Sequence, residues 1–462
     1  MTFDNFRPPF RKMLIANRGE IAIRIIRACH ELGIKTVAIH STADAEALHV
    51  KLASESICIG PPAPTESYLN QSAIVSAAVV TGADAVHPGY GFLSESASFA
   101  EMCNQCGLVF VGPTVQNIRM MGNKSLARQV AEENGVPVIP GSDKAGTDAG
   151  EALAQAKTLG FPVLIKASAG GGGRGMKIVE REEEFVRSFE SAKREVLAAF
   201  GDPNVYVEKY IQQPRHIEVQ IVGDRFGNVL HLGERDCSIQ RRYQKLIEES
   251  PAVNIPEEVK TAILDCAVRL ASAIGYASVG TIEFLLDSKT LDFYFIEMNT
   301  RLQVEHPVTE MVTRVDVVKE QIWVAAGYEV SFAQEDVKII GHAIEARINA
   351  ENPLTQMPSP GQISGYHPPG GFGVRVDSAL YDRYTVTPYY DSLIAKLIVY
   401  GNTRDEAIRK LLVALDEFII EGISTNMDLH RFVLNTESFT SGKVHTKLFD
   451  ELIEDYKNEV AE

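Results

Sequence analysis

Short apolar runs alternate with amphipathic stretches through the first third of the chain. Residues 21–32 carry apolar side chains at helical spacing directly after one such run. Strands that alternate with helices are typical of a parallel sheet, so we predict an α/β nucleotide fold up to about residue 122. The predicted strands are residues 13–16, 36–40, 56–59, 85–87 and 108–111.

A second predicted unit, residues 140–211, is built around a glycine-rich string. The glycines of residues 169–175 follow a predicted strand and match the spacing G-x-G-x-x-G. A dinucleotide-binding fingerprint needs a helix directly after the glycines, whereas residues 176–179 read as another strand. We therefore predict a mobile loop that covers phosphates, with a structural turn and a dinucleotide site as the alternatives.

Charge and hydropathy exclude two classes of partner. The chain has 45 Lys and Arg against 61 Asp and Glu, a net charge of −16, which disfavours nucleic-acid binding. The longest uncharged stretch, residues 67–83, contains several polar side chains and is shorter than the ~20 apolar residues that a membrane span needs. The N-terminus lacks the pattern of a signal peptide, so we expect a cytoplasmic protein.

The pair of apolar runs at residues 281–286 and 293–298 is the most informative region. A hairpin centred on Thr290 would place Glu283 directly opposite Glu297, and opposed like charges repel. Apolar neighbours flank both carboxylates, so they need a cation or a shared proton.

Asn299 shares the strand face of Glu297. Oxygen ligands of this kind suit magnesium, and we predict a metal site at Glu283, Glu297 and Asn299. The alternative is an accidental pairing in which one glutamate faces solvent.

Further charged residues follow this hairpin. Arg301, Gln303 and Glu305 share one parity in a segment that we expect to be extended, an arrangement that could hold a small oxyanion and remove its proton. On the predicted strand at residues 341–349, Arg347 shares a face with Glu345. The pattern leaves open whether Arg347 forms a structural ion pair with Glu345 or contacts a substrate.

Two lysines lie near the glycine loop. Lys166 ends the strand before the loop and can reach a phosphate, and Lys124 precedes the second unit. A lone lysine is usually solvated, but the position beside a glycine loop favours phosphate binding.

An ordered series of motifs resembles the biotin carboxylase family of ATP-grasp enzymes over about residues 11 to 455. The motifs include Asn17-Arg18-Gly19-Glu20, His87-Pro88-Gly89-Tyr90-Gly91, Lys166-Ala167-Ser168, Glu234-Arg235-Asp236, Gln244-Lys245 and Glu297-Met298-Asn299-Thr300-Arg301-Leu302-Gln303-Val304-Glu305-His306. The resemblance implies an α/β ATP-grasp fold with a Rossmann-like N-terminal domain at residues 1–122. Linker helices and a small mobile lid would follow at 123–211, and a larger C-terminal unit at 212–462.

The resemblance also implies a reaction. In such enzymes MgATP phosphorylates bicarbonate to carboxyphosphate, which breaks down to carbon dioxide and phosphate. The phosphate deprotonates a ureido nitrogen of biotin, and the resulting enolate attacks carbon dioxide. Clamping of phosphoryl oxygens by charges is the main catalytic device.

Roles for single residues follow from the same resemblance. Glu305 is then the base, Arg347 stabilises the biotin enolate, and Lys245 and Arg301 complete the catalytic set. Bicarbonate would lie against Lys245, Arg301, Gln303, Val304, Glu305 and Arg347, biotin against Tyr90, Gly91 and Arg347, and Mg²⁺ or Mn²⁺ against Glu283, Glu297 and Asn299. The ATP site would comprise Lys124, Lys166, Gly172, Gly173, Met176, Glu208, Lys209, Ile211, His216, Gln240, Tyr243, Glu283, Leu285 and Glu297. Position 243 is tyrosine where many relatives have a histidine.

Chain length bears on the partners. The chain contains no Met-Lys-Met biotinylation motif and stops at Glu462. It therefore resembles the free-standing subunit of an acetyl-CoA carboxylase of fatty acid synthesis. A separate biotin carboxyl carrier protein and carboxyltransferase subunits would be its partners, and a homodimer is expected.

Three alternatives stay open. The chain could serve another acyl-CoA carboxylase or a pyruvate carboxylase. It could be an ATP-grasp ligase that forms amides, or a catalytically silent nucleotide-binding subunit.

Overall fold

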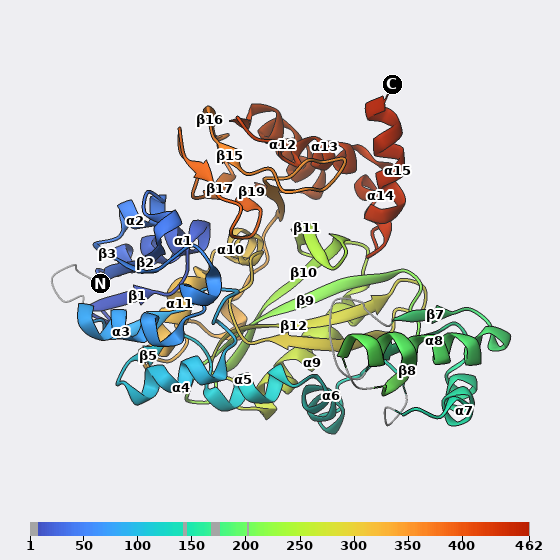
Figure 1. The fold of residues 1–462 in the computed structure, drawn as a ribbon. Helices are drawn as coiled ribbons and strands as arrows, with labels where there is room; N and C mark the ends of the chain where they lie inside the picture. Colours follow the sequence, from blue (N-terminus) through green and yellow to red (C-terminus); the bar gives the residue numbers. More distant parts are fainter. Residues whose placement is uncertain (1–7, 142–145, 168–175, 201–202, 462) are drawn as a thin grey trace.

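The computed structural model describes residues 8–141, 146–167, 176–200 and 203–461 (Figure 1). The glycine loop that the sequence singled out, residues 169–175, lies outside the described residues. Among the described residues, no helix has both the length and the apolar character that crossing a membrane requires.

The N-terminal part is a five-stranded parallel sheet in the order β3-β2-β1-β4-β5, which confirms the α/β prediction. Its core forms because the apolar runs of the strands meet the apolar face of α1, where Ile21 and Ile25 are buried. The strands are β1 (Lys12–Ile15), β2 (Lys35–Ser41), β3 (Glu55–Gly60), β4 (Ala85–His87) and β5 (Val109–Phe110). The helices are α1 (Gly19–Glu31), α2 (Leu48–Leu52), α3 (Gln71–Thr81) and α4 (Ala97–Gln105).

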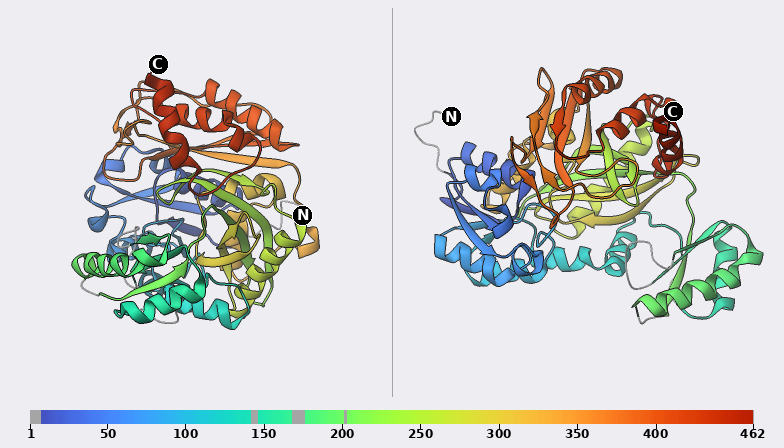
Figure 2. Two further views of the ribbon diagram at one scale, coloured as in Figure 1. Left: turned by 90° about the vertical axis from the view of Figure 1, so that its right-hand side faces the viewer. Right: turned by 45° about the horizontal axis from the view of Figure 1, so that its top comes forward.

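Two helices, α5 (Val115–Gly122) and α6 (Lys124–Glu133), lead to a small lid with a core of its own. The lid sheet has the order β7-β6-β8, and the right-hand view of Figure 2 shows the lid projecting from the rest of the molecule. Its elements are α7 (Ala149–Leu159), β6 (Val163–Ala167), β7 (Lys177–Val179), α8 (Glu182–Phe200) and β8 (Val205–Lys209). Strand β6 precedes the glycine loop and strand β7 follows it, as predicted, so the helix that a dinucleotide fingerprint needs is absent after the glycines.

The largest element is an antiparallel sheet of eight strands in the order β13-β12-β9-β10-β11-β14-β19-β17. Helix α9 packs on strands β9 and β10, and α10 packs on β10, β11, β14 and β19. The strands are β9 (Pro214–Gly223), β10 (Val229–Arg241), β11 (Gln244–Ser250), β12 (Ser278–Asp287), β13 (Phe293–Asn299), β14 (His342–Asn349), β17 (Val374–Ser378) and β19 (Leu393–Gly401). The helices between them are α9 (Glu257–Ala273), α10 (His306–Thr313) and α11 (Val317–Ala325).

The C-terminal helices cover the far end of this sheet and bury a core around Leu411, Val433 and Phe449. They are α12 (Arg404–Glu417), α13 (Met427–Asn435), α14 (Glu437–Thr440) and α15 (Leu448–Ala461). Four short strands form two small sheets beside them: β15 (Gly361–Gln362) with β18 (Thr385–Val386), and β16 (Gly365–His367) with β20 (Ile419–Glu421).

The β12–β13 hairpin confirms the predicted register at its most important point, because Glu283 pairs with Glu297. Nearer the turn the register differs from the prediction: Phe284 pairs with Phe295, so Ile296 is an extra residue in β13. This β-bulge shifts the turn end of the hairpin by one residue.

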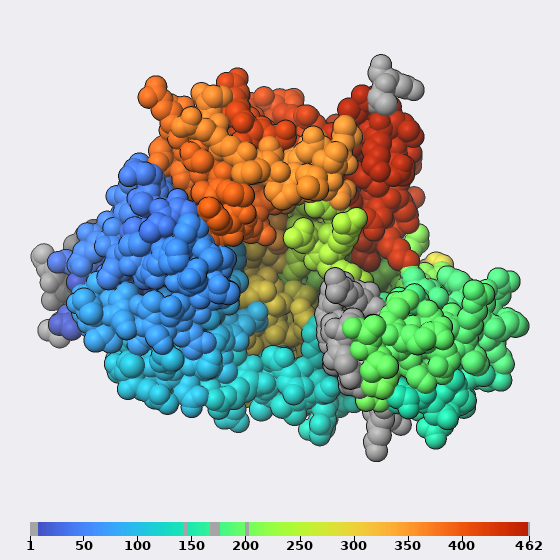
Figure 3. Space-filling model, viewed as in Figure 1, coloured from blue at the N-terminus to red at the C-terminus, as the bar shows by residue number. Residues whose placement is uncertain are grey.

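Figure 3 shows a central hollow between the N-terminal part, the lid and the C-terminal helices, with parts of the eight-stranded sheet exposed at its floor. The sheet is therefore the surface on which side chains from all three parts can meet.

Candidate active site

Lys245 lies at the centre of a buried cluster of charges. Its Nζ donates to Glu218 at 2.5 Å, to Glu283 at 2.9 Å and to Glu305 at 2.6 Å. Burial alone would lower the pKa of Lys245, but these three carboxylates outweigh it and raise the pKa well above its ordinary value. A permanent positive charge therefore sits among three acids that come from strands β9 and β12 and from the start of α10.

Glu305 is fully buried and immediately precedes helix α10. One carboxylate oxygen accepts from Lys245, and the other accepts from Nη2 of Arg347 at 2.8 Å. Burial would raise the pKa of Glu305, but Lys245, Arg347 and Arg235 hold it well below the ordinary range. The side chain predicted to be the base is thus ionised and held by two cations.

The extended segment predicted for residues 301–305 holds only as far as Gln303, because the chain turns at Val304 and Glu305. Arg301, Gln303 and Glu305 are nevertheless connected, as predicted. Nη1 of Arg301 donates to Oε1 of Gln303 at 2.8 Å, and Nε2 of Gln303 donates to Glu283 at 3.1 Å. Glu283 and Glu305 in turn share Lys245, so Arg301 and Gln303 connect to Glu305 through side chains rather than along one strand.

Arg347 has a different partner from the one the sequence suggested. Its Nε donates to Glu248 at 2.6 Å and its Nη2 to Glu305, whereas neither oxygen of the buried Glu345 has a hydrogen-bond partner. The ion pair between Arg347 and Glu345 that the sequence pattern suggested is therefore wrong. Burial raises the pKa of Glu248 to about 7 despite the opposing charge of Arg347.

The two carboxylates of the predicted metal site face different groups. Glu283 is buried and accepts from Lys245, from Asn299 at 2.8 Å and from Gln303, while its second oxygen lies 2.9 Å from Nε2 of His216. Lys245 and His216 overcome burial and lower the pKa of Glu283. Glu297 is about one-third exposed and lies 3.4 Å from Nζ of Lys124.

These three residues fit a magnesium ion by donor chemistry. Glu283 and the residues Glu297 and Asn299 on the other strand of the same hairpin offer carboxylate and amide oxygens, which is the ligand type that Mg²⁺ prefers. Lys124 and Lys245 pair with the two carboxylates. The metal site itself stays a prediction.

The residues expected to bind ATP lie on the lid and on the adjoining end of the large sheet. Lys166 on β6 forms an ion pair of 2.6 Å with the buried Glu208 on β8, and Lys124 is largely exposed. His216 on β9 lies opposite Leu285 on β12. The remaining members are Met176, Lys209, Ile211 and Gln240, while Gly172 and Gly173 lie outside the described residues.

Tyr243 stands apart from this set. It lies in the turn between β10 and β11, has a positive φ of 68° and is largely exposed. Among the residues that the structure describes, no predicted ATP-binding residue forms a hydrogen bond with Tyr243.

The expected biotin side lies in the loop after β4. The Tyr90 hydroxyl donates to Glu20 on α1, and Gly91 has a φ of 66°. A Cβ at Gly91 would meet no atom within 4 Å. Glycine therefore serves the left-handed backbone here and leaves space beside Tyr90.

Several residues of the cluster were not predicted. Glu218, Glu248 and Lys396 are buried charged residues on strands β9, β11 and β19, and Glu95 accepts from Nε of Arg301 at 2.9 Å. A charge inside an apolar strand run is rarely buried unless it is paired. The lysine in the run Leu393–Gly401 could have been found in this way.

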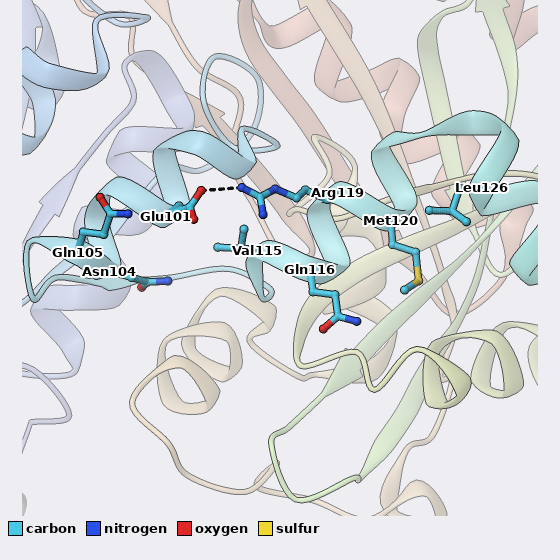
Figure 4. A pocket seen from close by; sticks show the side chains of 8 residues that line it. All are labelled: Glu101, Asn104, Gln105, Val115, Gln116, Arg119, Met120 and Leu126. Carbon is cyan, nitrogen blue, oxygen red and sulfur yellow. Dashed lines mark hydrogen bonds and ion pairs between the residues drawn. The ribbon is translucent and has the colours of Figure 1, made fainter.

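A surface hollow of about 840 Å³ lies elsewhere, over α4, α5 and α6 (Figure 4). None of the predicted site residues lines it, and its charged side chains Glu101 and Arg119 pair with each other at 2.6 Å. The hollow is therefore separate from the charged cluster.

Comparisons with known proteins match most of the chain. Residues 9–118 match the family model "Biotin carboxylase, N-terminal domain", residues 123–333 match "Carbamoyl-phosphate synthase L chain, ATP binding domain", and residues 345–451 match "Biotin carboxylase C-terminal domain". Biotin carboxylase 1 of Bacillus subtilis is 55% identical over 441 residues, which cover 95% of this chain and 98% of that protein.

Solved structures agree. A biotin carboxylase complex with β,γ-ATP from Campylobacter jejuni has a TM-score of 0.89 and 52% identity, covering 95% of this chain and 98% of that one. The biotin carboxylase domain dimer of Hydrogenobacter thermophilus 2-oxoglutarate carboxylase, in complex with MgADP, ADP and bicarbonate, has a TM-score of 0.88 and 49% identity. That match covers 96% of this chain and 98% of the other.

Proposed function

This chain belongs to the biotin carboxylase family, and from that premise we propose that it carboxylates biotin with bicarbonate and ATP. The reaction is the first half-reaction of an acetyl-CoA carboxylase, and its class is that of an ATP-dependent ligase forming a C–N bond. One observation carries the assignment of the site: a buried, ionised carboxylate, Glu305, is held between Lys245 and Arg347.

The first step is the activation of bicarbonate. Lys245, Arg301, Gln303 and the Val304 backbone hold the anion, and the ionised Glu305 accepts its proton. The freed oxygen attacks the γ-phosphorus of ATP, which gives carboxyphosphate and ADP. Lys124, Lys166, Glu208 and His216 orient the nucleotide, as do Met176, Lys209, Ile211, Gln240, Leu285 and the glycines 172 and 173, while Tyr243 stays a predicted contact.

A magnesium ion at Glu283, Glu297 and Asn299 would neutralise charge on the phosphates. Lys124 pairs with Glu297 and Lys166 with Glu208, and a triphosphate could take over both cations.

The second step transfers the carboxyl group. Carboxyphosphate breaks down to carbon dioxide and phosphate, and the phosphate removes the ureido proton of biotin. Arg347 stabilises the enolate, because Glu248 holds its Nε and leaves Nη2 at the end of the side chain beside Glu305. Tyr90 and Gly91 line the biotin side.

The assembly around this reaction is also part of the proposal. A homodimer is supported by the dimer of the Hydrogenobacter domain at 49% identity. We assign a biotin carboxyl carrier protein and carboxyltransferase subunits as partners, with fatty acid synthesis in the cytoplasm as the setting.

The domain limits stay a proposal as well: residues 1–122, 123–211 and 212–462. Separate sheets support the first two, and a single sheet of eight strands supports the third.

Transfer of labelled carbonate onto free biotin by the purified chain tests this function. We expect incorporation that needs ATP and Mg²⁺ together, and ATP hydrolysis that needs bicarbonate and rises with biotin. ATP hydrolysis driven instead by an amine acceptor, without label in biotin, would indicate an amide-forming ligase.

A further inference from the structure

A lysine outside the predicted site joins both ends of it. Lys396 on β19 is fully buried, and its Nζ donates to the Val304 carbonyl at 2.9 Å. The same Nζ lies 3.2 Å from Oε1 of Glu20, the oxygen that also accepts from the Tyr90 hydroxyl. One ammonium group thus contacts the residue before Glu305 and the partner of Tyr90.

The strand register explains how Lys396 reaches both groups. It lies directly opposite Arg347 in the β14–β19 pair, so it belongs to the layer of side chains that carries the proposed enolate-binding arginine. Glu20 approaches from α1 in the N-terminal part, and Val304 approaches from the turn before α10. Lys396 is therefore the point where three separate parts of the chain converge.

Two further carboxyl groups, those of Glu345 and Asp377, lie near Lys396, but neither forms a hydrogen bond with it. Asp377 lies 3.8 Å from Lys396 but already receives two hydrogen bonds from Arg375, at 2.9 and 2.7 Å. Replacing a whole buried ion pair by apolar side chains is often neutral for stability, whereas loss of Lys396 alone would leave the buried Glu20 without its cation. The short contacts of Lys396 are instead both made to groups that adjoin the reaction.

We propose that Lys396 is a positioning residue of biotin carboxylation, which fixes the turn carrying Glu305 and, through Glu20, the hydroxyl of Tyr90. The proposal rests on the function proposed above. Lys396 touches no reacting atom; it keeps the bicarbonate end and the biotin end of the site at a constant separation. Misplacement of a site by about 1 Å costs on the order of 100-fold in rate.

The variant Lys396→Met removes the ammonium group and keeps the chain length. We expect kcat/KM for free biotin to fall about 100-fold, and bicarbonate-dependent ATP hydrolysis without biotin to fall as well. Affinity for ADP, measured by calorimetry, should stay within about twofold, because the nucleotide residues lie on other elements. Lys410→Met is the matched control: Lys410 donates to the Tyr400 carbonyl at 2.5 Å away from the cluster, and its loss should leave both activities within about twofold.

A double-mutant cycle separates positioning from general weakening of the fold. If Lys396 holds Tyr90 through Glu20, Tyr90→Phe should raise KM for biotin much less in the Lys396→Met background than in the wild type. A folded Lys396→Met protein with kcat/KM for biotin within threefold of wild type would overturn the proposal. An undiminished effect of Tyr90→Phe would overturn it too.

A second variant covers the case in which Lys396→Met does not fold. Glu20→Ala keeps the contact of Lys396 with Val304 but removes its counter-ion and its link to Tyr90, so KM for biotin should rise more than tenfold, with a smaller effect on ATP hydrolysis. An unchanged KM would contradict the link. If the wild type itself transfers no carboxyl group to biotin, the proposed function fails; if the wild type is active and these variants match it, only the role of Lys396 fails.

Discussion

The charged cluster on the eight-stranded sheet and the nucleotide side of the site are built in opposite ways. In the cluster, Lys245, Glu305 and Arg347 are at most 15% exposed, and each contacts two or more charged partners. On the nucleotide side, the Lys124 side chain is 81% exposed and pairs with Glu297. Lys166 is 27% exposed and pairs with Glu208.

The difference indicates where the chain has fixed its geometry in advance. Charges that are buried among several partners cannot move without leaving another charge unpaired, which is costly. Exposed pairs contribute little free energy and exchange partners easily. The bicarbonate and biotin end is thus preorganised by the fold, whereas the nucleotide end depends on ligand charges.

Loss of the proposed base should have the largest effect. Glu305→Gln keeps the shape of the side chain but cannot accept the bicarbonate proton, so carboxylation should fall by 10³-fold or more. Nucleotide affinity should stay near wild type, because Lys124 and Lys166 lie elsewhere. Turnover near the wild-type rate in a label-transfer assay would refute the role of Glu305.

Loss of the central lysine, Lys245, should lower the free energy of unfolding much more than loss of an exposed lysine on the nucleotide side. Lys245→Met leaves three buried carboxylates without their shared cation, and we expect the free energy of unfolding to fall by about 3–5 kcal/mol. Lys124→Met, the matched change at the exposed end, should cost under about 1 kcal/mol. Urea titration of both variants checks this contrast; equal losses would contradict it.

The nucleotide end should respond to metal. Glu297→Gln removes one predicted magnesium ligand, so the Mg²⁺ concentration at half-maximal activity should rise about tenfold. Because Glu297 is partly exposed, the free energy of unfolding of the variant should change little. A magnesium titration that matches the wild type would count against the predicted ligand set.

The smallest effect concerns Glu345. Burial raises the pKa of this unpartnered carboxyl well above its ordinary value, so it is a neutral acid in the folded chain. The unfolded chain releases that proton above about pH 4.5, so wild-type stability falls as pH rises from there towards the folded pKa. Glu345→Gln has no proton to release.

The Glu345→Gln variant should therefore lie within about 1 kcal/mol of wild type at pH 5. As pH rises above about 4.5, its free energy of unfolding should increase relative to that of the wild type, by up to about 1 kcal/mol per pH unit until the folded pKa of Glu345 is reached. Parallel stability curves for the two proteins would show that Glu345 is already ionised.

Local pattern predicted the parallel sheet, the strand-to-strand glycine link and the pairing of Glu283 with Glu297. These features depend on periodicity and on residues close in sequence. The bulge at Ile296 and the turn at residues 304–305 follow from tertiary packing, which periodicity does not record.

The sequence pattern could not predict which residues of distant strands contact one another. Glu248 and Arg347 are 99 positions apart and meet only because β11 pairs with β14. By parity, Glu345 was an equally good partner for Arg347. Resemblance to the family supplied the role of Lys245, which no local signal distinguishes from other lysines.

The protonation state of Glu305 tests the central claim most directly. Infrared spectra of protein labelled with ¹³C-glutamate, recorded for the wild type and Glu305→Gln, isolate this carboxyl group as a difference band. The two cations beside it predict that the band is that of an ionised carboxylate from pH 8 down to at least pH 5. A band of the protonated acid within that range would contradict the account.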